Sequence, residues 1–272
     1  MGKIEQMEQM KHIRVEREGA VGILTIARRE RLNSLDVATA QDFRRAGLQL
    51  ARDRDVRAVV IRGEGGVFCS GADLKYIRDG GNQDGYGEIF KQILEYIHST
   101  ISEIRRAPKP FIAAVDGPAA AGGFGIAMSC DLVVASERAW FEWAYFKTGL
   151  TGAESSTFFL PRLVGLRKAL ELVLLNPRLT AREALGWGLI NRVVPDGSLD
   201  AEVLKIATEL AESPTAAVGV AKNLLNQAAG MDRLDVHLDA ELTELARIAD
   251  GPNFAEGLAA FFEKRSPEFE SE

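Results

Sequence analysis

Two glycine-rich loops carry the residues whose types and spacing could do chemistry. In each, a short apolar segment (Ala58–Arg62 or Phe111–Val115) is followed by small residues and then by the start of a helix. The first N–H groups of a helix lack intrahelical partners and lie at the positive end of its dipole, so each loop could attract negative charge. That charge could be a phosphate or a carbonyl oxygen that becomes an oxyanion. A tight turn packed for space would give the same pattern.

The repetition of this arrangement favours the oxyanion interpretation. The first loop reads GEGGVFCSG (Gly63–Gly71) and leads into a helix that starts at Ala72-Asp73-Leu74. The second loop holds Gly117-Pro118 and the pair Gly122-Gly123, where glycine lets a ligand approach the backbone closely. Two loops can each aim one N–H at a single carbonyl oxygen, and two donors are the minimum for an oxyanion hole.

The elements that must position these loops follow from the hydrophobic periodicity. It predicts strands at 12–16, 21–27, 58–62, 111–115 and 132–135, a helix capped by Asp36 that runs to Arg52, and a long amphipathic helix over Tyr86–Arg106. The glycine-rich segment 79–87 is predicted to be mobile. Four further helices are predicted at 199–211, 214–229, 234–249 and 253–264.

Composition excludes several classes of protein. A chain of 272 residues with 46% hydrophobic content can bury a large core. A net charge of −6 without a basic block argues against nucleic acid as the main ligand. The sequence shows neither an uninterrupted apolar run of membrane-spanning length nor the apolar segment of a signal peptide, so no membrane association is expected. Cys69 and Cys130 lack metal-ligand spacing and fit buried thiols in a reducing cytoplasm, the expected location.

Three motifs together carry a resemblance to a known family. FCSGADL (Phe68–Leu74), PFIAAVDGPAAAGG (Pro110–Gly123) and CDLVVAS (Cys130–Ser136) resemble the enoyl-CoA hydratase/isomerase family, also called crotonases. The resemblance runs from about Ile13 to the C-terminal end. It implies an α/β fold with a spiral of ββα turns and a C-terminal helical region that makes trimers. It also implies that the N–H groups of Ala72 and Gly122 polarise an acyl-CoA thioester carbonyl.

The sequence departs from this family at the acid and base positions. By resemblance, hydratases hold a water between two glutamates, whereas this chain has Gly125 and Tyr145 there. The isomerases keep one carboxylate, which aligns with Ala153, and the dehalogenases place their aspartate nucleophile at the same position. Glu154 follows directly and is the best acid/base candidate, although a surface or capping carboxylate would look the same. Glu154 would relocate a double bond through an oxyanion-stabilised enolate.

Two alternatives to the isomerase remain. In one, His98 and an aromatic wall serve a hydrolytic or dehalogenase-like reaction on an aromatic acyl-CoA, with Glu154 as base or nucleophile. His98 borders the apolar face of the helix 86–106, where it faces the acyl pocket or is a boundary histidine with one hydrogen bond. The wall would come from a cluster that could equally be core: Trp140, Phe141, Trp143, Tyr145 and Phe146. The other alternative is an acyl-CoA-binding protein without catalysis.

The resemblance also implies a coenzyme A site and an assembly. Coenzyme A would be part of the substrate, and no separate cofactor or metal is expected. The residues matched to its binding are Arg28, Arg31, Leu32, Ala72, Asp73, Leu74, Phe261 and Lys264, the last two reaching it from a neighbouring subunit. The expected assembly is a homo-trimer or a dimer of trimers. We predict a loose extension over residues 1–10, an acyl-CoA-binding core over 11–197 and a helical oligomerisation region over 198–272.

Overall fold

The apolar segments of the first half of the chain form a six-stranded sheet. The computed structural model describes residues 10–271, so the extension predicted for residues 1–10 lies almost wholly outside the described residues. The strand order is β1-β2-β3-β4-β6-β9, and all neighbours pair in parallel except the first two. The strands are β1 (Ile13–Glu18), β2 (Val21–Ile26), β3 (Ala58–Gly63), β4 (Phe111–Val115), β6 (Leu132–Ser136) and β9 (Arg192–Val194). Parallel strands need crossover connections, which the helices supply.

A second, smaller sheet turns the chain into a spiral. It contains β5 (Pro118–Ala120), β7 (Trp140–Glu142) and β8 (Leu179–Thr180), in the order β5-β7-β8. After β4 the chain passes to β5 and then to α4 (Gly122–Ser129), and after β6 it passes to β7 and later to α5 (Ser156–Val164). The preceding turn repeats the pattern, because Cys69, after β3, bridges to Ala119 of β5. The predicted spiral of ββα turns is confirmed.

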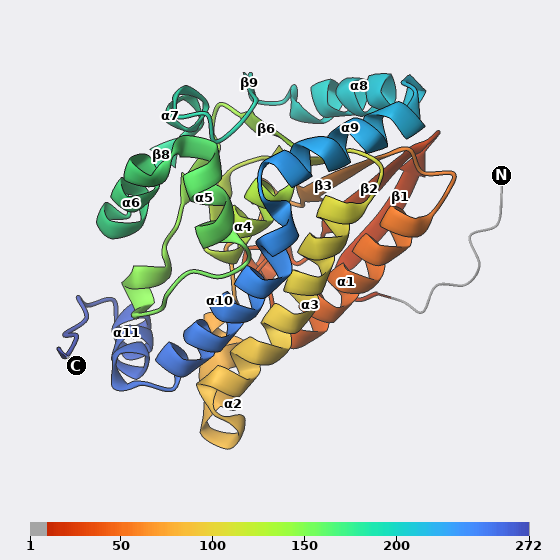
Figure 1. Cartoon of the computed structure of the whole chain (residues 1–272). Coiled ribbons are helices and arrows are strands. Elements are labelled where there is room, and N and C mark those ends of the chain that lie inside the picture. The colour runs from red at the N-terminus through yellow and green to blue at the C-terminus, as the bar shows by residue number, and fades with distance from the viewer. Residues whose placement is uncertain (1–9, 272) are drawn as a thin grey trace.

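Three long helices pack side by side over one face of the spiral (Figure 1). α3 (Tyr86–Arg106) lies between α1 (Val37–Arg52) and α10 (Leu234–Ala249). α1 begins where predicted, since the Asp36 carboxylate accepts a hydrogen bond from the Thr39 N–H at 2.8 Å. α3 buries the predicted apolar stripe of Phe90, Ile93, Leu94, Ile97, Ile101 and Ile104.

The segment 79–87, which is predicted to be mobile, is mostly helical, and its mobility stays a prediction. α2 (Leu74–Asp84) continues through most of it, and only Gly85 separates α2 from α3. Gly81 lets α2 pack closely against α3, because a Cβ on it would lie 2.0 Å from the Tyr86 ring. Asp73 caps the start of this helix through the N–H groups of Lys75 and Tyr76, both at 3.1 Å.

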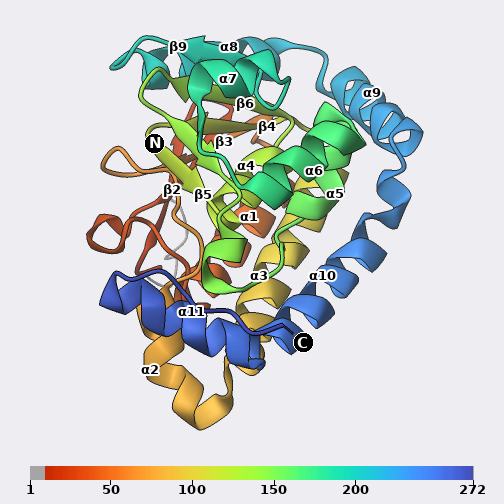
Figure 2. The ribbon, with the colours of Figure 1, turned by 90° about the vertical axis from the view of Figure 1, so that its left-hand side faces the viewer.

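The C-terminal third is helical, as predicted. α8 (Leu199–Glu212) packs on the sheet, α9 (Thr215–Ala228) leads to α10, and α11 (Pro252–Glu263) closes the chain. α8 lies at one end of the molecule, while α2 and α11 lie together at the other (Figures 1 and 2). The domain boundaries and the oligomerisation role stay predictions. No helix among residues 10–271 is long and apolar enough to span a bilayer.

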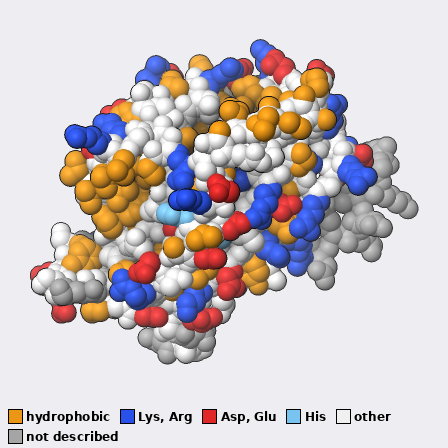
Figure 3. Space-filling view, viewed as in Figure 1, with side chains coloured by type: hydrophobic (Ala, Val, Ile, Leu, Met, Phe, Trp, Pro, Cys, Tyr) orange, Lys and Arg blue, Asp and Glu red, His pale blue; other side chains and the backbone are white. Residues whose placement is uncertain are grey.

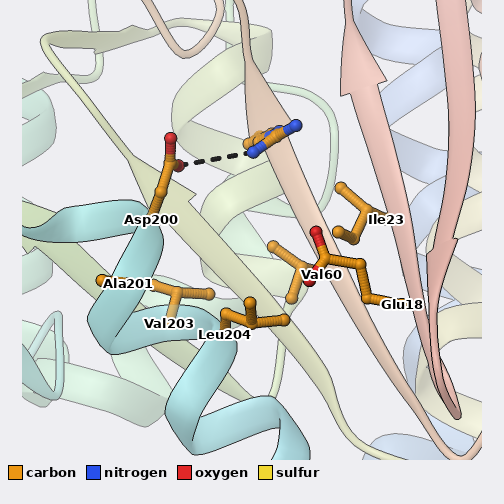
Figure 4. Close-up of a pocket in the computed structure, with 8 residues that line it drawn as sticks. Glu18, Ile23, Val60, Asp200, Ala201, Val203 and Leu204 are labelled. Carbon is orange, nitrogen blue, oxygen red and sulfur yellow. Dashed lines mark ion pairs between the residues drawn. The ribbon is translucent and has the colours of Figure 1, made fainter.

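The surface of the molecule has an apolar patch on one helix and a small cavity beside α8. Apolar side chains gather at the left of Figure 3, where α6 (Leu166–Leu175) exposes Leu166, Leu170, Leu174 and Leu175. A shallow cavity of about 150 Å³ lies where α8 meets the sheet (Figure 4), with Asp200 paired to Arg62 at 3.5 Å on its rim. Its other walls include the apolar Ile23, Val60 and Leu204.

Candidate active site

Backbone hydrogen bonds bring the two glycine-rich loops together. The N–H groups of Phe68 and Cys69 donate to the Pro118 carbonyl at 3.0 and 3.2 Å, and the Ala120 N–H donates to the Cys69 carbonyl at 3.0 Å. The loops then approach so closely that a Cβ on Gly71 would lie 3.1 Å from the Gly122 nitrogen. Gly71 has a φ of +90°, which an L side chain rarely adopts.

This contact brings the backbone of Ala72 and Gly122 to one cavity. The Leu35 N–H donates to the Gly71 carbonyl and the Leu35 carbonyl accepts from the Asp73 N–H, both at 2.8 Å. In such a parallel bridge the N–H of the residue between, Ala72, points away from Leu35. The Gly122 N–H is the first of α4 and has no intrahelical acceptor. Ala72 and Gly122 both line the same cavity.

That cavity has a volume of about 480 Å³ and lies between the loops, α2, η2 (Tyr145–Thr148) and α11. Its walls are mainly apolar, with Leu74, Phe90, Leu150 and Leu245 among them. Charged side chains of Glu30, Arg31, Lys75 and Lys147 line other parts of it. An apolar cavity with a few convergent polar groups is the usual form of a small-molecule site.

Glu154 places a buried carboxylate in this cavity. Its side chain contacts the cavity, although only 4% of the residue is exposed. A Cβ built on Gly122 would lie 2.8 Å from Glu154 Oε1, so this oxygen lies beside the first residue of α4. The other oxygen, Oε2, accepts a hydrogen bond from the Tyr145 hydroxyl. The carboxylate and the two N–H donors thus share one site.

The environment of Glu154 sets its acidity. Burial raises the pKa of Glu154 to about 7; the Tyr145 hydrogen bond acts to lower this pKa, and the nearby Glu241 carboxylate adds to the rise. Burial, followed by the Glu154 charge, also raises the pKa of Tyr145 well above its ordinary value, so the phenol stays a donor. A carboxyl with a pKa near 7 can both take and return a proton near neutral pH.

The absence of a side chain at Gly125 leaves space for Glu154. A Cβ on Gly125 would lie 2.3 Å from the Glu154 carbonyl oxygen and 2.7 Å from the Glu154 Cβ. Side chains at 125 and 154 therefore compete for the same space. Ala153 is fully buried, and its carbonyl accepts from the Tyr145 hydroxyl at 3.2 Å.

His98 lies behind the site. Its Nε2 accepts the Glu154 backbone N–H at 3.2 Å, and it is not among the residues that line the cavity in the described part of the chain. Burial lowers the pKa of His98 to about 3, although its hydrogen bond to the backbone of Leu238 acts in the opposite direction. The imidazole is therefore neutral. His98 is 6% exposed and has two hydrogen-bond partners, so it is a buried residue and neither faces the cavity nor matches a boundary histidine with one hydrogen bond.

The residues matched to coenzyme A divide into two groups. Those that line the cavity are Arg31, Leu32, Ala72, Asp73, Leu74 and Phe261. Arg28 is instead buried against two carboxylates, with ion pairs to Asp36 at 2.6 Å and Asp73 at 2.9 Å. Lys264 is the exposed C-cap of α11 and lies outside the lining. Phe261 reaches the cavity of its own chain. None of these placements tests coenzyme A binding, which stays a prediction.

Of the predicted aromatic wall, Tyr145 alone lines the cavity among the described residues. Trp143 is buried beneath it, with its indole N–H donating to the Ser156 hydroxyl at 3.2 Å, and Phe141 is fully buried. Trp143 and Phe141 are therefore core residues and not part of the cavity wall.

Sequence reasoning missed Glu241. This residue of α10 is 5% exposed and accepts hydrogen bonds from the N–H groups of Ser155 and Thr157. A signal was present in the sequence, because Glu241 interrupts the apolar stripe between Leu238 and Leu245. A carboxylate on the buried face of a helix needs partners there.

Comparison with known proteins supports the class that this fold and site define. The enoyl-CoA hydratase/isomerase family model matches residues 16–272. The chain belongs to the enoyl-CoA hydratase/isomerase family, as the sequence motifs indicated.

Its relatives carry different activities. The chain is 35% identical to 4-chlorobenzoyl coenzyme A dehalogenase-2 of Arthrobacter sp, over 93% of this chain and 91% of the relative. It is 34% identical to 1,2-epoxyphenylacetyl-CoA isomerase of Escherichia coli K12, over 93% and 95%. The crystal structure of an enoyl-CoA hydratase from Mycobacterium avium subsp. paratuberculosis K-10 superposes with a TM-score of 0.86 at 33% identity, over 96% and 99%. The family is thus established, while the reaction has to be argued from the site.

The crowding at Gly125 can be tested by Gly125→Ala. We expect this variant to lose roughly 1–3 kcal/mol of unfolding free energy, because the added methyl group meets the Glu154 backbone. Urea denaturation measures the loss. Gly186→Ala is the matched control, since a Cβ there meets nothing within 4 Å. Equal stability of the two variants would contradict the crowding.

The raised pKa of Glu154 predicts a pH-dependent stability. Its native pKa of about 7 exceeds the ordinary 4.5, so the native state binds more protons than the unfolded chain between these values. Native stability therefore falls as pH rises through this window. Glu154→Gln removes the cost, and we expect a gain of up to about 3 kcal/mol at pH 8 and almost none at pH 4.

Urea denaturation of Glu154→Gln at both pH values measures this difference. Glu244→Gln, which changes an exposed carboxylate on α10, serves as the control. A gain from Glu154→Gln that is the same at pH 4 and pH 8 would show that Glu154 has an ordinary pKa.

Proposed function

We propose that this protein moves a double bond in an enoyl-CoA thioester through an enolate, with Glu154 as the single acid and base. The observation that carries the proposal is the position of the Glu154 carboxylate beside Gly122, in the cavity that Ala72 also lines. Two N–H donors favour negative charge on a thioester oxygen, and a carboxylate beside them can reach the adjacent carbon.

The reaction needs one proton to leave and one to return. Unprotonated Glu154 removes a proton from C2 of a 3-enoyl-CoA, and the electron pair moves onto the thioester oxygen held by the two N–H groups. The protonated carboxyl then returns a proton at C4. The double bond thereby moves from C3–C4 to C2–C3, and no water is consumed.

Tyr145 would orient the carboxylate. Its hydroxyl holds Glu154 Oε2, which leaves Oε1 on the Gly122 side. The hydrogen bond also favours the charged carboxylate, so it moderates the rise in pKa that burial causes. Tyr145 itself stays protonated and acts as a donor.

The residues at positions 125 and 145 argue against a hydratase, and the place of His98 argues against a dehalogenase-like reaction. A two-glutamate hydratase lacks its acid and base here, because Gly125 and Tyr145 occupy those positions. The relatives named as dehalogenases support an aromatic acyl-CoA as the second candidate. That reaction would need Glu154 as its nucleophile, and neutral His98 lies behind the Glu154 backbone.

We further propose that coenzyme A enters along the mouth of the cavity. Leu32 and Phe261 expose apolar surface there, at 57% and 56%. Arg31 is held by Asp73 at 2.7 Å, and Lys75 and Lys147 add positive charge that suits phosphates. Arg28 would act indirectly, by fixing Asp73.

The reaction can be tested by incubating a 3-enoyl-CoA and a 2-enoyl-CoA with the protein in heavy water. We expect a moved double bond and deuterium uptake, measured by mass spectrometry, and a loss of roughly 100-fold or more in kcat for Glu154→Gln. Binding of a saturated acyl-CoA by that variant is the control for an intact site.

Other outcomes would redirect the assignment. Addition of a whole water would mean that another group activates water. Release of chloride from 4-chlorobenzoyl-CoA would favour the dehalogenase-like alternative. Binding of acyl-CoA without any turnover would favour the protein without catalysis.

The exposed leucines of α6 support the proposed homo-trimer or dimer of trimers, since contiguous apolar surface commonly marks an interface. Sedimentation should give three or six times the 29.7 kDa chain mass. We expect Leu174→Glu to shift the protein toward smaller species. A monomeric wild-type protein would contradict the assembly.

A further inference from the structure

The residue that carries the proposed chemistry lies on a strained piece of backbone. Glu154 and Ser155 have φ values of 49° and 63°, in the left-handed region that disfavours side chains. Such a conformation persists only where the surroundings fix it. Ser155 is also the N-cap of α5, and its own side chain makes no capping hydrogen bond. The first N–H groups of α5 therefore need an acceptor from elsewhere.

Glu241 of α10 is that acceptor. Its Oε2 accepts the Ser155 N–H at 2.8 Å, and its Oε1 accepts the Thr157 N–H at 3.0 Å together with the Thr157 hydroxyl. Next to these bonds, His98 of α3 holds the Glu154 N–H. The backbone at 154–157 is thus fixed from α3 and α10, two helices that pack against each other.

We propose that Glu241 is a positioning residue for Glu154: by holding the N–H groups on either side of Ser156, it fixes the left-handed turn that brings the Glu154 carboxylate beside Gly122. This inference rests on the proposed function for its effect on turnover. Glu241 is itself outside the residues that line the cavity in the described structure, so it acts on Glu154 through the backbone that it holds and through its charge, which adds to the rise in the Glu154 pKa.

Both carboxylate oxygens are needed for this role. Each one accepts a backbone N–H, so an amide in place of the carboxylate would turn an NH2 group toward one of these donors. An unpaired donor in a buried place is costly, and the turn would then give way. Glu241→Gln therefore breaks one of these two hydrogen bonds although glutamine has nearly the same size as glutamate.

Three variants test the assignment. Glu241→Gln removes one acceptor. Thr157→Val keeps the side chain's shape and removes the hydroxyl, which bonds to Glu241 and also to His237 Nε2 at 2.8 Å. Glu244→Gln is the matched control on the same helix, where the carboxylate is exposed and bonded to Arg247 at 2.9 Å. Two readouts are measured: amide hydrogen exchange by mass spectrometry for the peptide that spans 154–159, and kcat and KM with a 3-enoyl-CoA.

For Glu241→Gln we expect faster exchange confined to the 154–159 peptide and a fall in kcat of roughly 10- to 100-fold, with KM within about threefold of the wild type. Thr157→Val should give smaller changes in the same direction, which keeps the test valid if Glu241→Gln fails to fold. Glu244→Gln should change neither readout.

Unchanged exchange at 154–159 in Glu241→Gln, or a kcat within twofold of the wild type, would overturn the assignment. A wild-type protein without turnover would instead refute the proposed function, and the exchange readout would then decide by itself whether Glu241 holds the turn.

Discussion

The fold keeps one carboxylate almost out of water in a cavity that Ala72 and Gly122 of the two glycine-rich loops also line. Burial disfavours the charge of Glu154, and the Tyr145 hydroxyl favours it, so the group is held between its two protonation states. The neighbouring N–H groups belong to two loops that backbone hydrogen bonds join. The loops, α4 and the α3–α10 pair can all be understood as the support of this arrangement.

The support comes from parts of the chain that are distant in sequence. The N–H groups come from the two loops, the hydroxyl from η2 and the acceptors behind Glu154 from α3 and α10. α11 closes the same cavity through Phe261, so one chain contains every wall described here. The C-terminal helices thus contribute to the site as well as to the exposed surface of the molecule.

Many elements of the fold and part of the candidate site could be predicted from the sequence. The features that could not be predicted depend on contacts between residues far apart in the chain. Strands, the cap at Asp36 and the bounds of α3 follow from local periodicity, which the sequence displays directly. The glycines of 79–87 did not indicate the helix that forms there. Gly81 lies so close to the Tyr86 ring that a side chain would not fit, and composition does not reveal such a neighbour. Glu154 was identified by its place beside Ala153, whereas Glu241 was missed because a long-range contact gives it its role.

The crowding between positions 125 and 154 limits how this protein could have acquired its residues. A glutamate at 125 and the present backbone at 154 cannot coexist, because a single added carbon at 125 already meets that backbone. Suppose that a carboxylate at 125 were exchanged for one at 154 by single substitutions. The intermediate would have either a clash between position 125 and the backbone at 154 or no carboxylate at all. Changes at the two positions depend on each other, and exchanging the catalytic residues of related proteins one at a time should fail at this pair.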